Sequence, residues 1–455
     1  MFSDTIVAIA TPPGFGGISI VRLSGKNSID IVNKLFSKDI GNADGYTIHY
    51  GKITDNNGKV LDEVLVSVFR APKSYTGENS VEINCHGGMT GANAILLQCI
   101  KSGARAALGG EFTKRAFLNG KIDLAQAEAV ADIINSNSEK ALSLGVNQLG
   151  GALSKQINKA REHLITIMAQ ISSEADFPDE GVSGFSDDSL KSEISASLEI
   201  LSNLLETAHE GRSVRDGISV ALLGKPNAGK SSLLNALLNK NRAIVTAIPG
   251  TTRDTVEDYM QLDGIALKII DTAGIRTASD EVEKIGIDLS KKAAQEADIS
   301  IYVADLSTEP DADDKQIATL LKDKKVVLVL NKTDIAKDGL DEKYKLIFEN
   351  APVCYICAQT SEGIGGVKDT IKTIINTQNI NTASSAMLTN IRHIEAVTNA
   401  YNLVKNSIDA YNTGIPADFI SVDLQSAIEH LGSVTGMNVS EEIVDRVFKD
   451  FCVGK

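Results

Sequence analysis

One short stretch of the chain has the residue types and the spacing of a phosphate-binding loop. Gly224, Gly229, Lys230 and Ser231 follow the pattern G-x-x-x-x-G-K-S, with an apolar run on each side. Glycines let backbone N–H groups curl around phosphates, and the amino end of the following helix adds a favourable dipole. In such a loop the lysine reaches the β- and γ-phosphates, and the serine hydroxyl ligates Mg²⁺. The pattern predicts a nucleotide site built from a strand, a loop and a helix.

Three further segments indicate which nucleotide this loop binds. The apolar run VVLVL leads into Asn331, Lys332 and Asp334, and this aspartate can accept two hydrogen bonds from guanine N1–H and the 2-amino group. LKIIDTAG supplies Asp271 for the outer shell of the metal and Gly274 to sense the γ-phosphate. VTAIPGTTRD lies between the loop and LKIIDTAG, as a switch segment should. The four segments in this order predict a GTPase rather than an ATPase.

The residue that orients the attacking water differs from that of small signalling GTPases. Those proteins carry a glutamine directly after the DTAG glycine, whereas here the residue is Ile275, whose side chain cannot position water. Glu283 is a candidate for this role, with Glu281 as a rival. A counter-cation is also needed for the charge that an arginine finger would neutralise.

The chain ends in FCVGK, which places the thiol of Cys452 close to a lysine and a carboxyl terminus. A C-a-a-X lipidation signal is rejected, because glycine replaces an aliphatic residue and no polybasic stretch precedes it. The segment SEEIVDRVFKDF is amphipathic, so the tail is expected to be held by a packed helix. Cys452 is predicted to be functional. Cys85 and Cys99 are expected in the core, in a strand and a helix, and the Cys354/Cys357 pair is expected to be structural.

Composition limits the class of protein. The 455 residues carry a net charge of −14 and are 43% hydrophobic, which argues against a protein that coats nucleic acid non-specifically. The basic stretch 101–121 is expected to be either a solvated surface or a contact for an anion or RNA. The N-terminus lacks a basic region, no apolar run is long enough to cross a bilayer, and the five scattered cysteines fit reduced thiols, so a cytoplasmic location is expected.

The hydrophobic pattern divides the chain into regions of different type. Short apolar runs with one helical stretch, GANAILLQCIKSG, predict an α+β domain at 1–118. Helical spacing begins at about 119 and gives way to alternating strands and helices, and three amphipathic helices follow a polar linker near the end. We expect a multidomain α/β protein, in which an α/β domain interrupts one helical domain. The predicted limits are 1–118, 119–215 for the first helical part, 216–378 for the inserted domain and 379–455 for the second helical part.

Several longer motifs are more specific than the nucleotide segments. They are IATPPGFGGISIVRLSG, GEFTKRAFLNGKIDLAQAEAVADII, GKPNAGKSSLLN, GTTRD, DTAGIR, NKTD and FCVGK. With these motifs the chain resembles, over its full length, the MnmE (TrmE) family of tRNA-modification GTPases. The resemblance implies a folate-binding α+β N-terminal domain through which the protein dimerises, a discontinuous helical domain and an inserted Ras-like P-loop GTPase domain.

The resemblance also implies a chemistry and partners. Members work with the flavoprotein MnmG, which carries the FAD, to add an aminomethyl-type group at C5 of the wobble uridine of certain tRNAs. The one-carbon unit comes from a tetrahydrofolate derivative, either 5-formyl- or methylene-tetrahydrofolate. A different class of function also fits the nucleotide motifs: a GTP-gated RNA or ribosome assembly factor without covalent chemistry. The folate-side residues and the terminal cysteine distinguish the two.

The resemblance implies site residues position by position. GTP hydrolysis in the family is driven by K⁺, and the matching K⁺ ligands are Asn227, Thr246, Ile248 and Thr251. Thr252 joins Ser231 as a ligand of Mg²⁺, and Glu283 matches the glutamate that orients water. The folate-binding positions are Arg22, Glu82, Lys121 and Lys455, with Cys452 on the one-carbon side. The full set expected around GTP is Asn227, Ala228, Gly229, Lys230, Ser231, Ser232, Thr246, Thr251, Thr252, Asp271, Thr272, Ala273, Gly274, Asn331, Lys332 and Asp334.

Overall fold

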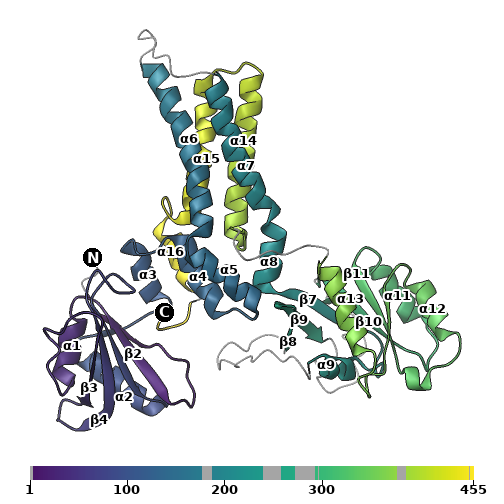
Figure 1. Cartoon of the computed structure of the whole chain (residues 1–455), viewed down its shortest axis with the longest axis horizontal. Helices are drawn as coiled ribbons and strands as arrows, with labels where there is room; N and C mark the ends of the chain where they lie inside the picture. The colour runs from purple at the N-terminus through teal and green to yellow at the C-terminus, as the bar shows by residue number, and fades with distance from the viewer. Residues whose placement is uncertain are drawn as a thin grey trace.

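The computed structural model describes residues 4–176, 187–238, 258–271, 293–295, 297–376, 386–449 and 451–455. These residues form two six-stranded sheets, separated in the chain by a tall group of helices (Figure 1). The predicted fold class, a multidomain α/β protein with a discontinuous helical part, is confirmed. The domain limits given above stay predictions.

The first sheet is built from the N-terminal part of the chain. Its strands are β1 (Ile6–Ile9), β2 (Ile18–Ser24), β3 (Thr47–Thr54), β4 (Val60–Phe69), β5 (Ser80–His86) and β6 (Arg105–Ala106). Their order is β3-β4-β5-β2-β1-β6, with β1 and β6 parallel and the other pairs antiparallel. Burial alternates along much of β3, β4 and β5, whereas β1 is buried at three consecutive residues.

Two helices cover this sheet, and the sequence pattern predicted one of them. Helix α2 (Met89–Lys101) is the expected one, and α1 (Ser28–Leu35) was not expected. Isoleucines and valines in SIDIVNKL resemble a strand, because β-branched residues favour strands. Their burial, however, follows the helical spacing from Ile29 to Val32. The predicted positions of Cys85 on β5 and Cys99 on α2, both buried, are confirmed.

Helices follow the first sheet and return after the second. The first group is α3 (Glu111–Leu118), α4 (Leu124–Ile134), α5 (Glu139–Leu149), α6 (Ala152–Asp176), α7 (Asp187–Glu206) and α8 (Ala208–Asp216). The second group is α14 (Ile391–Asn412), α15 (Ala417–Thr435) and α16 (Glu441–Lys449), as the three amphipathic segments predicted. One hydrophobic core joins α6, α7, α14 and α15, which stand side by side in Figure 1. Neither group could bury its apolar faces alone.

The second sheet lies in the chain between these two groups. Its described elements are β7 (Ile218–Leu223), α9 (Lys230–Leu238), β8 (Asp258–Leu262), β9 (Ile265–Asp271), β10 (Ile299–Asp305), α11 (Ala312–Leu320), β11 (Lys325–Asn331), the short 3₁₀ helix η1 (Thr333–Ile335), α12 (Leu340–Ile347), β12 (Val353–Tyr355) and α13 (Ile364–Asn376). The strand order is β12-β11-β10-β7-β9-β8, with β8 antiparallel and the others parallel.

Both faces of this sheet are covered, as expected for parallel strands. Along β7, Val220 and Leu222 join a core shared with α9 and α13, whereas Ala221 and Leu223 join a core shared with α12. The carboxyl ends of β7, β10 and β11 thus meet at one edge, where ligands of open α/β sheets bind. Among the described helices, none combines the length and the apolar character needed to span a bilayer.

Candidate functional site

The loop between β7 and α9 has a backbone that its glycines make possible. The φ angles of Gly224, Asn227 and Gly229 are 137°, 63° and 100°. A Cβ added at Gly224 would lie 2.3 Å from the carbonyl oxygen of Val303, and one at Gly229 would lie 2.1 Å from Nδ2 of Asn331. Both glycines are therefore required by close approach as well as by dihedral angle. The cradle fits a phosphate chain.

Lys230, the first residue of α9, has its ammonium group folded over this loop. Its Nζ donates to the carbonyl oxygens of Gly224, at 2.6 Å, and Lys225, at 2.8 Å. Ser231 and Ser232 follow on the first turn of α9, and both are exposed. The lysine is thus held where a β- or γ-phosphate would meet it, and the serine hydroxyls are open to a ligand or a hydrated Mg²⁺.

The predicted guanine segment is joined to the phosphate loop by one buried amide. Asn331 donates through Nδ2 to the carbonyl oxygen of Ala228, at 2.7 Å, and accepts from the backbone N–H of Ala358, at 3.0 Å. It is only 2% exposed. The side chain therefore fixes three loops that are distant in the chain, and its role is to position them.

Asp334 is exposed on η1, so its carboxylate can receive the edge of a base. The preceding Lys332 adopts a left-handed backbone with φ 63°, and its Nζ lies 2.6 Å from Oδ2 of Asp305. The thiol of Cys357 lies 3.4 Å from Oδ1 of Asp334. Cys354 instead contacts Thr370, so the two cysteines have different neighbours, and both are free thiols.

Several predicted residues fall outside the described part of the chain. These are Thr246, Ile248, Thr251, Thr252, Thr272, Ala273, Gly274 and Glu283. Asp271 is the last residue of β9 and pairs in register with Leu222 of β7, directly before the phosphate loop. Asn227 is exposed at the tip of that loop. The roles assigned to all of these residues stay predictions.

A second group of predicted residues meets on the first sheet. Arg22 of β2 faces Glu82 of β5 in register, and Nε of Arg22 lies 2.8 Å from Oε1 of Glu82. Nη1 of Arg22 donates to the carbonyl oxygen of Gly454, at 3.0 Å. Lys455 is half-buried beside them: burial lowers its pKa, and the charge of Arg22 lowers it further. Arg22, Glu82 and Lys455 are therefore neighbours, although they are far apart in the chain.

The C-terminal tail is held in place by backbone contacts. Val453 forms a bridge with Gly109, and the N–H of Gly110 donates to the carbonyl oxygen of Cys452, at 3.2 Å. A Cβ at Gly454, where φ is 99°, would lie 2.6 Å from the carbonyl oxygen of Ile9. The expectation of a fixed tail is confirmed. The thiol of Cys452 remains exposed at this site.

Lys121 approaches a different segment from the other three positions that were predicted to bind folate. Its Nζ donates to the carbonyl oxygen of Pro72, at 3.2 Å, and the side chain is exposed. Two aromatic neighbours of Arg22 were missed. Its guanidinium lies 5.8 Å from the ring centroid of Phe112. The second neighbour is Tyr75: burial raises the pKa of this residue, and the charge of Arg22 partly offsets the effect of burial. Neither aromatic residue has a spacing in the sequence that marks it.

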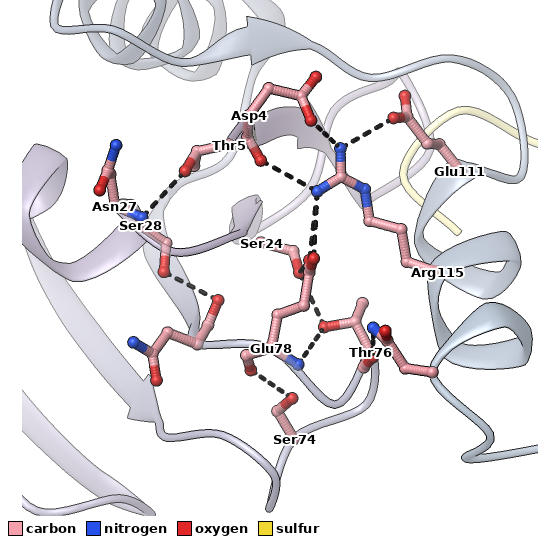
Figure 2. Close-up of polar contacts among 12 residues, drawn as sticks. Asp4, Thr5, Ser24, Asn27, Ser28, Ser74, Thr76, Glu78, Glu111 and Arg115 are labelled. Atoms are coloured by element: carbon pink, nitrogen blue, oxygen red, sulfur yellow. Dashed lines mark hydrogen bonds and ion pairs between the residues drawn. The ribbon is translucent and has the colours of Figure 1, made fainter. Parts of the chain in front are cut away.

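The basic stretch 101–121 is neither a solvated surface nor an open contact for RNA at its centre. Arg115 is fully buried, and Figure 2 shows its guanidinium between Asp4, Glu78 and Glu111. The distances are 2.8 Å to Asp4, 3.2 Å to Glu78 and 3.1 Å to Glu111. Arg105 also pairs with Asp4 and Glu111, at 2.7 and 2.6 Å. At Arg115 both alternatives, a solvated surface and a contact for an anion or RNA, were wrong, because two of the carboxylates come from other parts of the chain. Lys101 and Lys121 of the same stretch are exposed.

The chain matches models of two protein domains. One is described as the MnmE helical domain and matches residues 124–452, and the other as the GTP-binding protein TrmE N-terminus and matches residues 5–121. A solved G domain of the T. maritima FeoB iron transporter is 30% identical over 35% of this chain and 98% of its own, but its TM-score of 0.27 is too low to add to the assignment.

Two similar proteins are alike over their whole length. A tRNA modification GTPase MnmE from Carboxydothermus hydrogenoformans is 43% identical, and one from Lachnoclostridium phytofermentans is 44% identical, each covering 100% of both chains. The phosphate loop and the guanine segment described above agree with a GTP-hydrolysing enzyme. The chain therefore belongs to the MnmE (TrmE) family of tRNA modification GTPases.

Proposed function

We propose that this GTPase works with the flavoprotein MnmG to add an aminomethyl-type group at C5 of the wobble uridine of certain tRNAs. The one-carbon unit comes from a tetrahydrofolate derivative held on the first sheet, and FAD is carried by the partner alone. The protein acts as a homodimer in the cytoplasm. Support comes from the family and from the folate-side cluster.

The observation that carries this proposal is the seating of the C-terminal tail on the pair of Arg22 and Glu82. The carbonyl oxygen of Gly454 accepts from Arg22, which also binds Glu82. A carboxylate suits the donor edge of a pterin ring, and nearby cations such as Lys455 suit the carboxylates of its glutamate tail. An exposed thiol, Cys452, lies two residues before Gly454 in the tail that Arg22 binds. A protein that uses GTP only to gate RNA binding has no need of such an arrangement.

On the nucleotide side, each residue has a proposed task. Lys230 meets the β- and γ-phosphates, Asp334 selects guanine, and Ser231 with Thr252 holds Mg²⁺. Bound K⁺ supplies the positive charge that an arginine finger would give, and its ligands are Asn227, Thr246, Ile248 and Thr251. Glu283 orients the attacking water.

The modification is tested by nucleoside analysis of tRNA from cells that lack the protein and from cells that carry variants. We expect the C5 group of the wobble uridine to disappear in the deletion and in Cys452→Ser, while the GTPase rate of purified Cys452→Ser stays normal. Val453→Ala is the matched control, because this neighbouring side chain is exposed. Unchanged wobble uridines in the deletion strain would refute the proposal.

The cation is tested by measuring GTP turnover in K⁺ and in Na⁺. We expect turnover to fall sharply in Na⁺, and the difference to vanish in Asn227→Gly. Glycine tolerates the φ of 63° at this position, so the variant removes the side-chain oxygen without adding backbone strain. Equal rates of the wild-type protein in the two salts would rule out the K⁺ site.

A further inference from the structure

The second residue of the phosphate loop, Lys225, is tied to a helix that is distant in the sequence. Its Nζ lies 2.8 Å from Oδ2 of Asp311 and 2.6 Å from Oδ2 of Asp314. Asp311 caps the amino end of α11: its side chain accepts from the N–H groups of Asp313 and Asp314, and its own N–H donates to Asp314 at 2.7 Å. Both carboxylates are therefore fixed by the helix terminus before the lysine reaches them.

Asp314 is the buried member of this pair, with 1% of its surface exposed. The hydroxyl of Tyr302 donates to its other oxygen, and the Tyr302 ring stacks on Phe348 with centroids 4.3 Å apart. Tyr302 lies on β10, next to β7, so the anchor belongs to the core of the sheet. A buried carboxylate held this way needs a cation, because an unpaired buried charge is strongly unfavourable.

The backbone of Lys225 takes part in the phosphate loop at the same time. Its carbonyl oxygen accepts from Nζ of Lys230, at 2.8 Å, and from the N–H of Ala228, at 3.3 Å. Lys225 thus connects the rigid end of α11 with the catalytic lysine of the loop. Burial would lower the pKa of Lys225, but hydrogen bonds to Asp311 and Asp314 raise it, so the side chain stays charged at neutral pH.

We propose that Lys225 is a positioning residue for GTP: its ammonium group anchors the phosphate loop on Asp311 and Asp314 and cancels their charge next to the triphosphate. Without Lys225, two carboxylates would face a loop that must accept an anion, and the carbonyl oxygen that holds Lys230 would lose its side-chain anchor. The role follows from the GTPase activity alone and does not depend on the proposed modification chemistry.

The test compares steady-state GTP hydrolysis by the full-length protein and by Lys225→Met, Lys225→Arg and Lys343→Met. For Lys225→Met we expect KM for GTP to rise about tenfold, the size of one charge-assisted interaction, with kcat within about twofold. Lys225→Arg keeps the charge and should stay within about threefold of the wild-type KM. Lys343, which pairs with Glu309 on the surface of the same domain, is the control and should leave both constants unchanged.

Two further measurements separate a charge effect from a general loss of structure. At constant K⁺, the excess KM of Lys225→Met should shrink as choline chloride is added, because salt screens the repulsion between the exposed carboxylate of Asp311 and the triphosphate. In the double variant Lys225→Met/Asp311→Asn, the rise in log KM over the wild type should be about half of that in Lys225→Met, because one of the two carboxylates has lost its charge. If Lys225→Met does not fold, Lys225→Gln provides the same comparison. A reduced kcat with an unchanged KM, or a wild-type KM in Lys225→Met, would overturn the proposal.

Discussion

Two consecutive helices, α3 and α4, each carry a buried ionic cluster, and the two clusters have opposite charge at their centres. In the α3 cluster, the cation Arg115 is surrounded by the carboxylates of Asp4, Glu78 and Glu111 (Figure 2). In the α4 cluster, the carboxylate of Glu128 is surrounded by cations and donors. Arg392 binds it at 2.8 Å, and Nε2 of His393 lies 2.6 Å away.

The difference between the clusters is how many groups stay paired when the central charge is removed. Arginine stays protonated in proteins, so the α3 cluster cannot relax by losing the charge at its centre. The hydrogen bonds from Arg105 and Arg115 hold the pKa of Asp4 below its usual value, even though burial works against ionisation. In the α4 cluster, Arg392 also donates to the carbonyl oxygens of Ser433 and Val434, so this cation keeps acceptors if Glu128 is lost. We therefore expect the α3 cluster to be the less tolerant of mutation.

Replacing Arg115 by methionine should give the largest effect. The change leaves Glu78, whose side chain is 9% exposed, without its cation, and it removes the hydrogen bond from α3 to the backbone of Asp4 before β1. We expect a loss of about 4 kcal/mol in the free energy of opening, as found when one partner of a buried ion pair is removed. Hydrogen exchange of the β1 and α3 amides in the full chain measures this locally, because a multidomain chain does not unfold in one step.

Arg105→Met is the control for this prediction. Arg105 binds two of the same carboxylates, but 45% of its side chain is exposed, and Arg115 would still pair with both carboxylates. A loss of less than about 1 kcal/mol is expected, in line with exposed ion pairs. Equal losses in the two variants would contradict the view that the buried cation organises the cluster.

Glu128→Gln should have a smaller effect than Arg115→Met. The amide keeps one acceptor for Arg392 or Asn390, and Arg392 keeps its bonds to the carbonyl oxygens of Ser433 and Val434, so it does not become an unpaired charge. A loss of about 3 kcal/mol is expected in the protection of α4 and α14 amides, from the charge-assisted bonds that disappear. A loss greater than that of Arg115→Met would reverse the proposed order of the two clusters.

The contribution of Glu128 should also depend on pH in a defined direction. Burial opposes its ionisation, but His393 and Arg392 outweigh burial and lower the pKa of Glu128 from 4.5 to about 2. Because the pKa of Glu128 is lower in the folded than in the unfolded protein, its ionised carboxylate stabilises the fold fully above pH 4.5. This contribution is lost as the pH falls toward 2. By pH 3.5 the wild-type protein should have lost about 1.4 kcal/mol of it. The stability of Glu128→Gln in the same region should lack this part of the pH dependence.

The phosphate loop could be predicted from the sequence, because its residues are close together in the chain. Gly224, Gly229 and Lys230 lie within seven positions, and their spacing alone implies the backbone conformation that the loop adopts. The anchor of Lys225 on Asp314 could not be read in this way. It depends on β7 and β10 being neighbours in the sheet, which no local pattern specifies.

The same reason explains why the charged clusters were missed. Arg115 and Asp4 are 111 positions apart, and Arg392 and Glu128 are 264 apart. A basic stretch in the sequence looks the same whether its partners are water or distant carboxylates. The cluster of Arg22, Glu82 and Lys455 is equally non-local, and only the resemblance to a family placed these residues together before the structure did.

The smallest effect is expected at the edge of the α4 cluster, where Arg215 of α8 binds Asp132 of α4. Nε of Arg215 lies 2.7 Å from Oδ1 of Asp132, and Nη1 donates weakly, at 3.4 Å, to the carbonyl oxygen of Thr389. Burial raises the pKa of Asp132, and the charge of Arg215 lowers it only in part. Without Arg215, this carboxyl group can take up a proton more easily than Glu128 can.

Arg215→Met should therefore cost only about 1 kcal/mol in the protection of the α8 and α4 amides. This small loss is expected even though α8 precedes the inserted GTPase domain in the chain and Thr389 follows it. Arg212→Met, an exposed position on the same helix, should change nothing measurable. A loss of about 3 kcal/mol or more in Arg215→Met would show that this edge cannot relax by protonation. The difference in tolerance between the clusters would then depend on burial, and protonation of a carboxyl partner would not reduce the loss of stability. Repeating the measurement at pH 5 decides between these readings, because protonation of Asp132 would reduce the cost of Arg215→Met there and burial would not.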